Sequence, residues 1–212
     1  GNLISAADNA NRNQTYSYSN ANELLESVDA KNERYTYTYA DDNPHRLVAA
    51  RSKQLGNGFV YQYDDYGNVL NMYSGYLYDD KNLDFTMPSI YSGKTYNSTH
   101  NYVTSEKDSR GKTITYTVND ANGLVSKITS PAPVGSMLQE VSTSYSYNEQ
   151  NPYLLGSVSR GGISNYFGYD SINRLTSIYH NGFNYNFTYD KWGNPLKTMI
   201  QNRMLWENEY EA

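Results

Sequence analysis

Apolar and polar residues alternate along most of the chain. The segments 112–118 (KTITYTV) and 183–189 (FNYNFTY) place aromatic or β-branched residues at every second position, with polar residues between them. A period of two puts these two kinds of side chain on opposite faces of a β-strand. The pattern therefore predicts short strands that each carry one apolar face.

Short polar segments between the strands predict tight turns. Asp at the first position of a type I turn accepts hydrogen bonds from backbone N–H groups ahead of it. Gly or Asn at the fourth position tolerates the positive φ of a G1 bulge. Six segments have both features. They are Asp8 to Asn11, Asp29 to Asn32, and four whose end residues are predicted structural turn residues: Asp64 and Gly67, Asp108 and Gly111, Asp170 and Asn173, and Asp190 and Gly193.

Strand and turn recur as a repeat. We take as anchor the second aromatic residue of each Tyr-x-Tyr-like pair: Tyr18, Tyr39, Tyr63, Tyr147, Tyr169 and Tyr189, with Val118 as a degenerate member. Gly or Asn stands four residues after each anchor, at Asn22, Asn43, Gly67, Asn122, Asn151, Asn173 and Gly193. Another stands seven residues before all but one, at Asn11, Asn32, Gly56, Gly111, Gly162 and Gly182. Agreement at linked offsets indicates a true repeat.

Each repeat is predicted to be two strands and two turns, so the chain is a string of antiparallel hairpins. Single hairpins cannot bury a face alone, and neighbours must stack. A propeller is the competing architecture, but its blades require a super-period of two repeats, which is absent. We expect an all-β, curved and spiralling open sheet. We also expect one array over residues 1–212, a fragment of a longer protein, with irregular insertions near 84–107 and 130–143.

Composition narrows the classes of function. The chain has 24 Tyr, no Cys and a formal net charge of −5. Without Cys there are no disulfides or thiolate metal sites. A moderately acidic chain without Lys/Arg clusters lacks the footprint of a nucleic-acid binder. No apolar run is long enough for a membrane span. We therefore expect neither nucleic acid nor a membrane span as partner.

Candidate chemistry is sparse. The recurring Asp64, Asp170 and Asp190 stand where turns need Asp, and the histidines His45, His100 and His180 lack metal-ligand spacing. Catalytic and phosphate-binding motifs are missing. We expect no catalytic residue, metal or cofactor, and not an enzyme.

Aromatic residues at turn tips suggest binding instead. Tyr66 and Trp192 occupy the third turn position, where a polar residue is more usual. Together with Trp206 they are candidate glycan-binding residues, because aromatic rings stack on sugars. The structural alternative is that these tips pack on the next hairpin.

The repeated phrases resemble a known family. Tyr169-Asp170-x-x-Asn173-Arg174-Leu175, and the related segments starting at Tyr63 and Tyr189, are similar to the YD repeat of the Rhs/YD-repeat family. That family includes polymorphic toxin shells, Tc-toxin C components, wall-associated YD-repeat proteins and teneurins. The resemblance implies a partial β-shell that encloses a C-terminal effector.

From this resemblance we expect a non-enzymatic structural segment of a secreted or cell-surface bacterial protein, contributing to a shell that encloses or presents a toxin-like C-terminal domain. Its partners are then neighbouring repeats and the cargo domain of the same polypeptide. The alternative is a carbohydrate-binding or adhesin module that recognises cell-surface or wall glycans through exposed aromatic residues.

Overall fold

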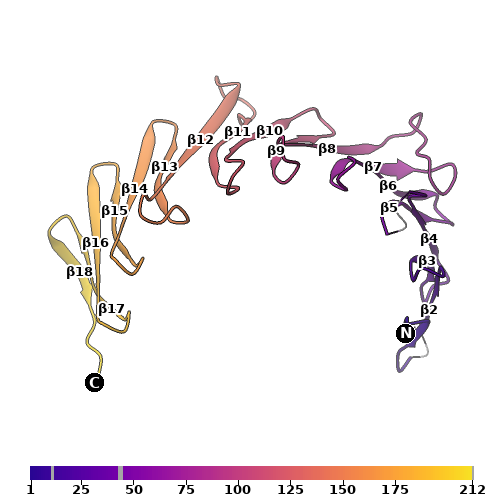
Figure 1. Cartoon of the computed structure of the whole chain (residues 1–212), viewed down its shortest axis with the longest axis horizontal. Helices are drawn as coiled ribbons and strands as arrows, with labels where there is room; N and C mark the ends of the chain where they lie inside the picture. The colour runs from indigo at the N-terminus through magenta and orange to yellow at the C-terminus, as the bar shows by residue number, and fades with distance from the viewer. Residues whose placement is uncertain (11, 43–44, 212) are drawn as a thin grey trace. The chain divides into compact units, whose positions relative to one another are not determined.

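The computed structural model describes residues 1–10, 12–42 and 45–211, so Asn11 and Asn43 of the repeat pattern lie outside the described residues. Within this part of the chain the secondary structure consists of 18 β-strands (Figure 1). A helix with the length and apolarity needed to cross a membrane is absent from it. The strands are β1 Ser5–Ala7, β2 Asn13–Tyr18, β3 Leu24–Val28, β4 Arg34–Tyr39, β5 Leu47–Ser52, β6 Asn57–Tyr63, β7 Val69–Tyr76, β8 Ile90–Tyr96, β9 Val103–Asp108, β10 Thr113–Val118, β11 Val125–Pro131, β12 Glu140–Tyr147, β13 Leu155–Arg160, β14 Ile163–Tyr169, β15 Leu175–His180, β16 Phe183–Tyr189, β17 Pro195–Ile200 and β18 Arg203–Glu207.

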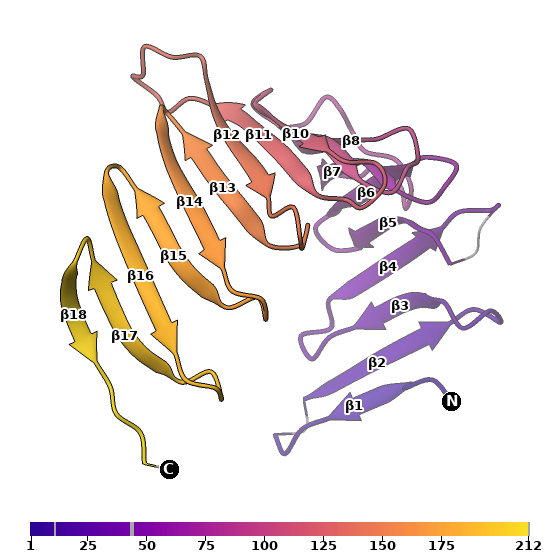
Figure 2. The ribbon, with the colours of Figure 1, turned by 60° about the vertical axis from the view of Figure 1, so that its left-hand side comes forward.

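The chain forms two compact units. The N-terminal unit comprises Gly1–Tyr96 and Ser105–Lys112, and the C-terminal unit comprises Asn97–Thr104 and Thr113–Ala212. In the N-terminal unit, β1 to β8 pair antiparallel in sequence order. In the C-terminal unit, β10 to β18 do the same. Figure 2 shows that strands consecutive in the sequence lie side by side within each unit.

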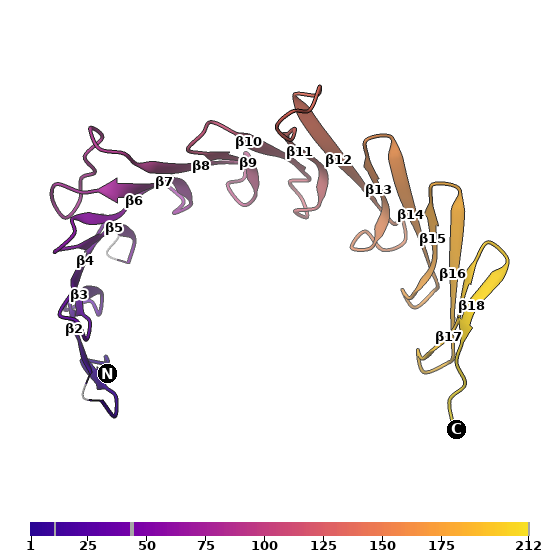
Figure 3. The same ribbon diagram turned by 180° about the vertical axis from the view of Figure 1, so that it is seen from behind.

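The predicted all-β fold of antiparallel hairpin repeats in an open, curved sheet is confirmed. Pairing runs on from one repeat to the next within each unit, whereas propeller blades are separate sheets, so the propeller alternative is wrong. Figures 1 and 3 show that the row of strands curves within each unit. Whether residues 1–212 act as one array within a longer protein stays a prediction.

The two faces of the sheet differ in chemistry. Directly paired residues share a face, and faces alternate along a strand. In the C-terminal unit one face, which we call the anchor face, carries the anchor tyrosines and a row of paired apolar residues: Phe167, Ile178, Tyr185 and Ile200. The adjacent row on the opposite face is Gly168, Ser177, Asn186 and Met199. The sheet of the C-terminal unit is thus amphipathic over these strands.

A small core lies on the opposite face of the N-terminal unit. The fully buried hydrophobic residues of the described chain are Ala49, Leu77 and Leu83, with Val60 and Tyr73 packed against them. Leu77 and Leu83 belong to the segment 77–89 that joins β7 to β8. This segment folds back over β4 to β7.

Asp80 fastens that segment to the sheet. Its carboxylate accepts hydrogen bonds from Lys53 Nζ at 2.8 and 2.9 Å and from Arg51 Nη1 at 3.3 Å. The hydrogen bond from Lys53 is the largest cause that holds the pKa of Asp80 below its ordinary value.

Sequence reasoning expected an insertion near 84–107. The segment between β7 and β8 is 77–89, which begins before that range, and β8 and β9 occupy much of the rest of the range. The second irregular segment, 132–139, lies between β11 and β12 within the expected range.

Candidate functional site

The Asp190 turn shows how each repeat closes its hairpin. The Asp190 carbonyl accepts a hydrogen bond from the Gly193 N–H at 3.2 Å, and the Asp190 N–H donates to the Asn194 carbonyl at 3.0 Å. Asp190 Oδ1 accepts from the N–H groups of Trp192 and Asn194 at 2.8 and 2.9 Å. Gly193 has φ of 93°. The Asp caps its own turn, and Gly supplies the left-handed conformation.

The other predicted turn residues have the same arrangement. Asp64, Asp108 and Asp170 each accept from the N–H groups two and four residues ahead, and φ is positive at Gly67, Gly111 and Asn173. The sheet register shifts at Tyr63, Tyr169 and Tyr189, the anchors that directly precede Asp64, Asp170 and Asp190. In the turn after Val118 the positive φ falls on Gly123 instead of the expected Asn122.

Hydrogen bonds of this kind stabilise the charged form of Asp170 and Asp108 and so lower the pKa of both carboxyls. The backbone N–H of Arg174 is the largest cause that lowers the pKa of Asp170. The N–H of Lys112 does the same for the pKa of Asp108. Both oxygens of Asp170 are engaged, because Oδ2 accepts from Arg174 Nε at 2.6 Å. Within the described residues no three His, Cys, Asp or Glu side chains gather in a metal-binding group.

Most anchor tyrosines join their repeat to the one before it. The Tyr189 hydroxyl donates to the Leu175 carbonyl at 2.8 Å, and the Tyr39 hydroxyl donates to the Leu24 carbonyl at 3.1 Å. In both cases the acceptor is the residue paired with the previous anchor. Tyr63 and Tyr147 bond to Leu47 and Val125 in the same way. Burial is the largest cause that raises the pKa of Tyr39 and of Tyr63.

Two further anchors escaped the sequence pattern. The Tyr96 hydroxyl donates to the Val69 carbonyl at 3.0 Å, and the Tyr210 hydroxyl donates to the Pro195 carbonyl at 3.1 Å. Asn97, next to Tyr96, accepts through Oδ1 from the N–H groups of Asn101 and Tyr102, and His100 has φ of 60°. These two tyrosines are recognised by the hydrogen bond from their hydroxyl to a carbonyl of the previous repeat. The sequence alone does not show this bond.

Arg174 links two consecutive turns of the C-terminal unit. Its Nη1 donates to the Asp190 carbonyl at 2.7 Å, and its guanidinium lies 5.0 Å from the centre of the Tyr189 ring. Arg46 lies over the Tyr63 ring at 5.4 Å. Arg after the turn therefore contacts the Tyr-Asp segment of the next repeat.

The candidate glycan-binding residues are solvent-exposed but scattered. Tyr66 is 71% exposed, Trp192 is 70% exposed and Trp206 is 40% exposed. Tyr66 belongs to the N-terminal unit and the two tryptophans to the C-terminal unit. Trp206 lies on β18 and not at a turn tip. Lys191 Nζ stands 4.0 Å from the centre of the Trp192 ring. Tyr66 and Trp192 thus keep most of their side-chain surface accessible to solvent.

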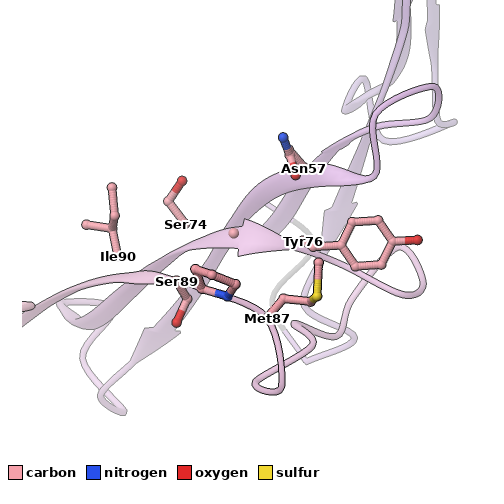
Figure 4. Close-up of a pocket in the computed structure, with 8 residues that line it drawn as sticks. Asn57, Ser74, Tyr76, Met87, Ser89 and Ile90 are labelled. Carbon is pink, nitrogen blue, oxygen red and sulfur yellow. The ribbon is translucent and has the colours of Figure 1, made fainter.

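A pocket that the sequence did not reveal lies in the N-terminal unit. It has a volume of about 440 Å³ and is lined by Asn57 from β6, Ser74 to Tyr76 from β7, and residues 87 to 90 from the segment that leads into β8. Figure 4 shows Tyr76 and Met87 at one end and Ile90 at the other. None of the lining side chains is charged.

Comparison with known proteins identifies the fold. No protein-family model and no curated protein matches the chain. A crystal structure of the TcdB2–TccC3–Cdc42 complex matches 94% of this chain with a TM-score of 0.50 and 14% identity, and the match covers 12% of that chain. The chain thus spans about an eighth of that structure's length.

Two further solved structures match this chain with TM-scores too low to support a conclusion about its structure. The Photorhabdus luminescens Tc holotoxin pore matches 94% of this chain and 15% of its own, with a TM-score of 0.35 and 14% identity. A porin-like protein from Bacteroides uniformis matches 92% of this chain and 86% of its own, with a TM-score of 0.36 and 14% identity. What the comparisons establish is the fold: an all-β sheet of hairpins like part of the TcdB2–TccC3–Cdc42 structure.

Proposed function

We propose that this chain is a non-enzymatic structural segment of a YD-repeat shell. The observation that carries the proposal is the bond from most anchor tyrosines to a carbonyl of the previous repeat, as from Tyr189 to Leu175. Such bonds fix a repeat on its predecessor and favour a continuous wall built from similar parts. Stacked repeats of this kind extend a surface instead of building one globular core.

The amphipathic sheet supports a role in enclosure. Within the described residues, the anchor face of the C-terminal unit has no second layer over Phe167, Ile178 and Tyr185, which remain half-buried. An apolar face of this extent in a soluble protein marks a surface that meets another part of the same or another chain. The proposed occupant is a cargo domain of the same polypeptide, and neighbouring repeats are the other partner.

The fold likeness to a TcdB2–TccC3–Cdc42 structure agrees with membership of the Rhs/YD-repeat family and with a secreted or cell-surface location. The test uses the full-length parent polypeptide under limited proteolysis. A cargo domain inside a shell is resistant while the shell is folded and becomes sensitive under conditions that unfold the repeats. A downstream region that is accessible from the start, or a parent chain without further repeats, overturns the proposal.

A second candidate function is glycan binding through the turn tips. It is favoured by the exposure of Tyr66 and Trp192, because an accessible aromatic ring can stack on a sugar ring. A glycan array with the soluble chain tests it. Binding that disappears in Trp192→Ala, with unchanged thermal unfolding, supports this function. A blank array counts against it.

A further inference from the structure

The pocket between β6, β7 and the start of β8 has walls that hydrogen bonds and glycines hold in place. Tyr76 stands over Gly56, where an added Cβ would lie 2.3 Å from the Tyr76 ring. The Leu77 N–H donates to the Gly56 carbonyl at 2.8 Å, which fixes the end of β7 beside that glycine. Glycine in a strand region often marks such a close approach. The aromatic wall is therefore set before any ligand arrives.

The opposite wall is fixed by a turn. The Asp84 N–H donates to the Tyr76 carbonyl at 2.8 Å, and the Met87 N–H donates to the Asp84 carbonyl at 3.1 Å. Gly75 on the floor approaches Ser89 so closely that an added Cβ would lie 3.1 Å from the Ser89 Cβ. These contacts hold Met87 and Ser89 against β7. A preformed pocket loses less entropy when a ligand binds.

Polar side chains lie at this pocket. Some serines of the sheet bond to a residue across the strand pair, as Ser159 does to Ser164 at 2.7 Å. Within the described residues, the side chains of Asn57 and Ser74 have no such partner, although they lie on the same face of the sheet at the pocket. In Figure 4, Asn57 and Ser74 project from neighbouring strands to the same side. An apolar ligand would desolvate these groups without replacing their hydrogen bonds to water, at a cost.

We propose that this pocket binds one neutral sugar ring. One face of a pyranose carries C–H groups that pack on an aromatic ring such as Tyr76, and its hydroxyls bond to amide and hydroxyl side chains. The lack of charge in the lining disfavours anionic and cationic ligands. The volume of about 440 Å³ lies in the range of about 300–1,000 Å³ for small-molecule sites. The site is separate from Trp192 and Tyr66, and it is independent of the shell role.

The experiment is a titration of the whole chain with a panel of neutral methyl pyranosides, followed by amide chemical shifts in NMR spectra. We expect shifts that cluster at the lining residues, with Kd on the order of 1 mM. Tyr76→Ala should weaken binding about tenfold, as for a buried aromatic anchor. Tyr76→Phe keeps the ring and should bind normally. The matched control is Tyr78→Ala, because Tyr78 is exposed but lies outside the pocket lining.

A second pair of variants protects the test against misfolding. Ser74→Ala should weaken binding, and Ser74→Thr, which keeps a hydroxyl, should restore part of it. The proposal is overturned if no pyranoside shifts the lining residues at concentrations on the order of 50 mM, far above the expected Kd. It is also overturned if indole binds and sugars do not, or if the shifts fall on Trp192 and Tyr66 instead. None of these results bears on the shell, which protease protection tests.

Discussion

The hydroxyl of Tyr210 donates to the carbonyl of Pro195 at 3.1 Å, the relation that Tyr189 has to Leu175 one repeat earlier. Pro195 is paired with Tyr189 in the sheet, as Leu175 is with Tyr169. The tyrosine of the Tyr-Asp phrase thus holds the preceding repeat, whereas the aspartate holds its own turn. Because the tyrosine and the aspartate make different contacts, we expect different effects when each is substituted.

Tyr189→Phe should lower the free energy of unfolding by about 0.5–1.5 kcal/mol, because the partly buried Leu175 carbonyl loses its donor while packing is kept. Urea unfolding followed by circular dichroism measures this. Tyr179→Phe is the matched control, since Tyr179 is 46% exposed on the opposite face. Equal effects of the two substitutions would show that the hydroxyl bond to the previous repeat is unimportant.

Gly193→Val should destabilise the chain by on the order of 1 kcal/mol or more, because a β-branched residue is strained at a φ of 93°. No atom lies within 4 Å of the position of an added Cβ, so the cost is conformational and not steric. Asn173→Gly, at a φ of 66° in the equivalent position, should be neutral or stabilising. The same thermal midpoint for Gly193→Val and wild type would contradict the assigned turn.

Arg174→Lys should cost about 1 kcal/mol, because Lys cannot donate to Asp170 and Asp190 together while stacking on Tyr189. Arg110→Lys is the control: Arg110 lies 3.6 Å from Asp108, but its side chain is 86% exposed. Exposed pairs contribute little. Chemical unfolding of both variants distinguishes a link between turns from a surface ion pair.

Acid should destabilise the fold below about pH 4. The Asp170 and Asp108 carboxyls have pKa values below the ordinary 3.8, chiefly because backbone N–H groups bond to the charged form. A group whose pKa is lower in the folded state stabilises above its unfolded pKa, and this is lost as pH falls through the folded pKa. Thermal midpoints from pH 7 to pH 2 should therefore fall steeply at the acid end.

Asp170→Asn with Asp108→Asn tests the cause of that acid sensitivity. Asn accepts the same turn bonds, as Asn119 does from the Ala121 N–H at 2.8 Å, but it does not titrate. The double variant should show a shallower loss of stability with acid than the wild type. An unchanged slope would mean that other carboxyls dominate.

Sequence reasoning identified the hairpins because alternation and the Asp-to-Gly turn are local properties, visible at Asp64 and Asp190 alike. It missed the anchor Tyr96 because Asn97 replaces Asp. It missed Tyr210 because Asn208 stands where the pattern has the first aromatic residue of the pair, and Glu211 follows in place of Asp. The pocket was invisible for a different reason: it depends on the path of segment 77–89, which no periodic pattern specifies. Exposure of the tips likewise depends on what neighbouring hairpins leave uncovered.

Because the hydroxyl donor and the carbonyl acceptor recur in most repeats, we expect the array to tolerate the gain or loss of whole repeats. Removal of the 20 residues from Asp170 to Tyr189 would place Tyr169 directly before Asp190 and recreate the phrase at the junction. A gene encoding such a chain can gain or lose copies by recombination between similar segments, and each product retains a matched donor and acceptor. The number of repeats, and with it the length of the sheet, can therefore change during evolution while the contacts between repeats are kept.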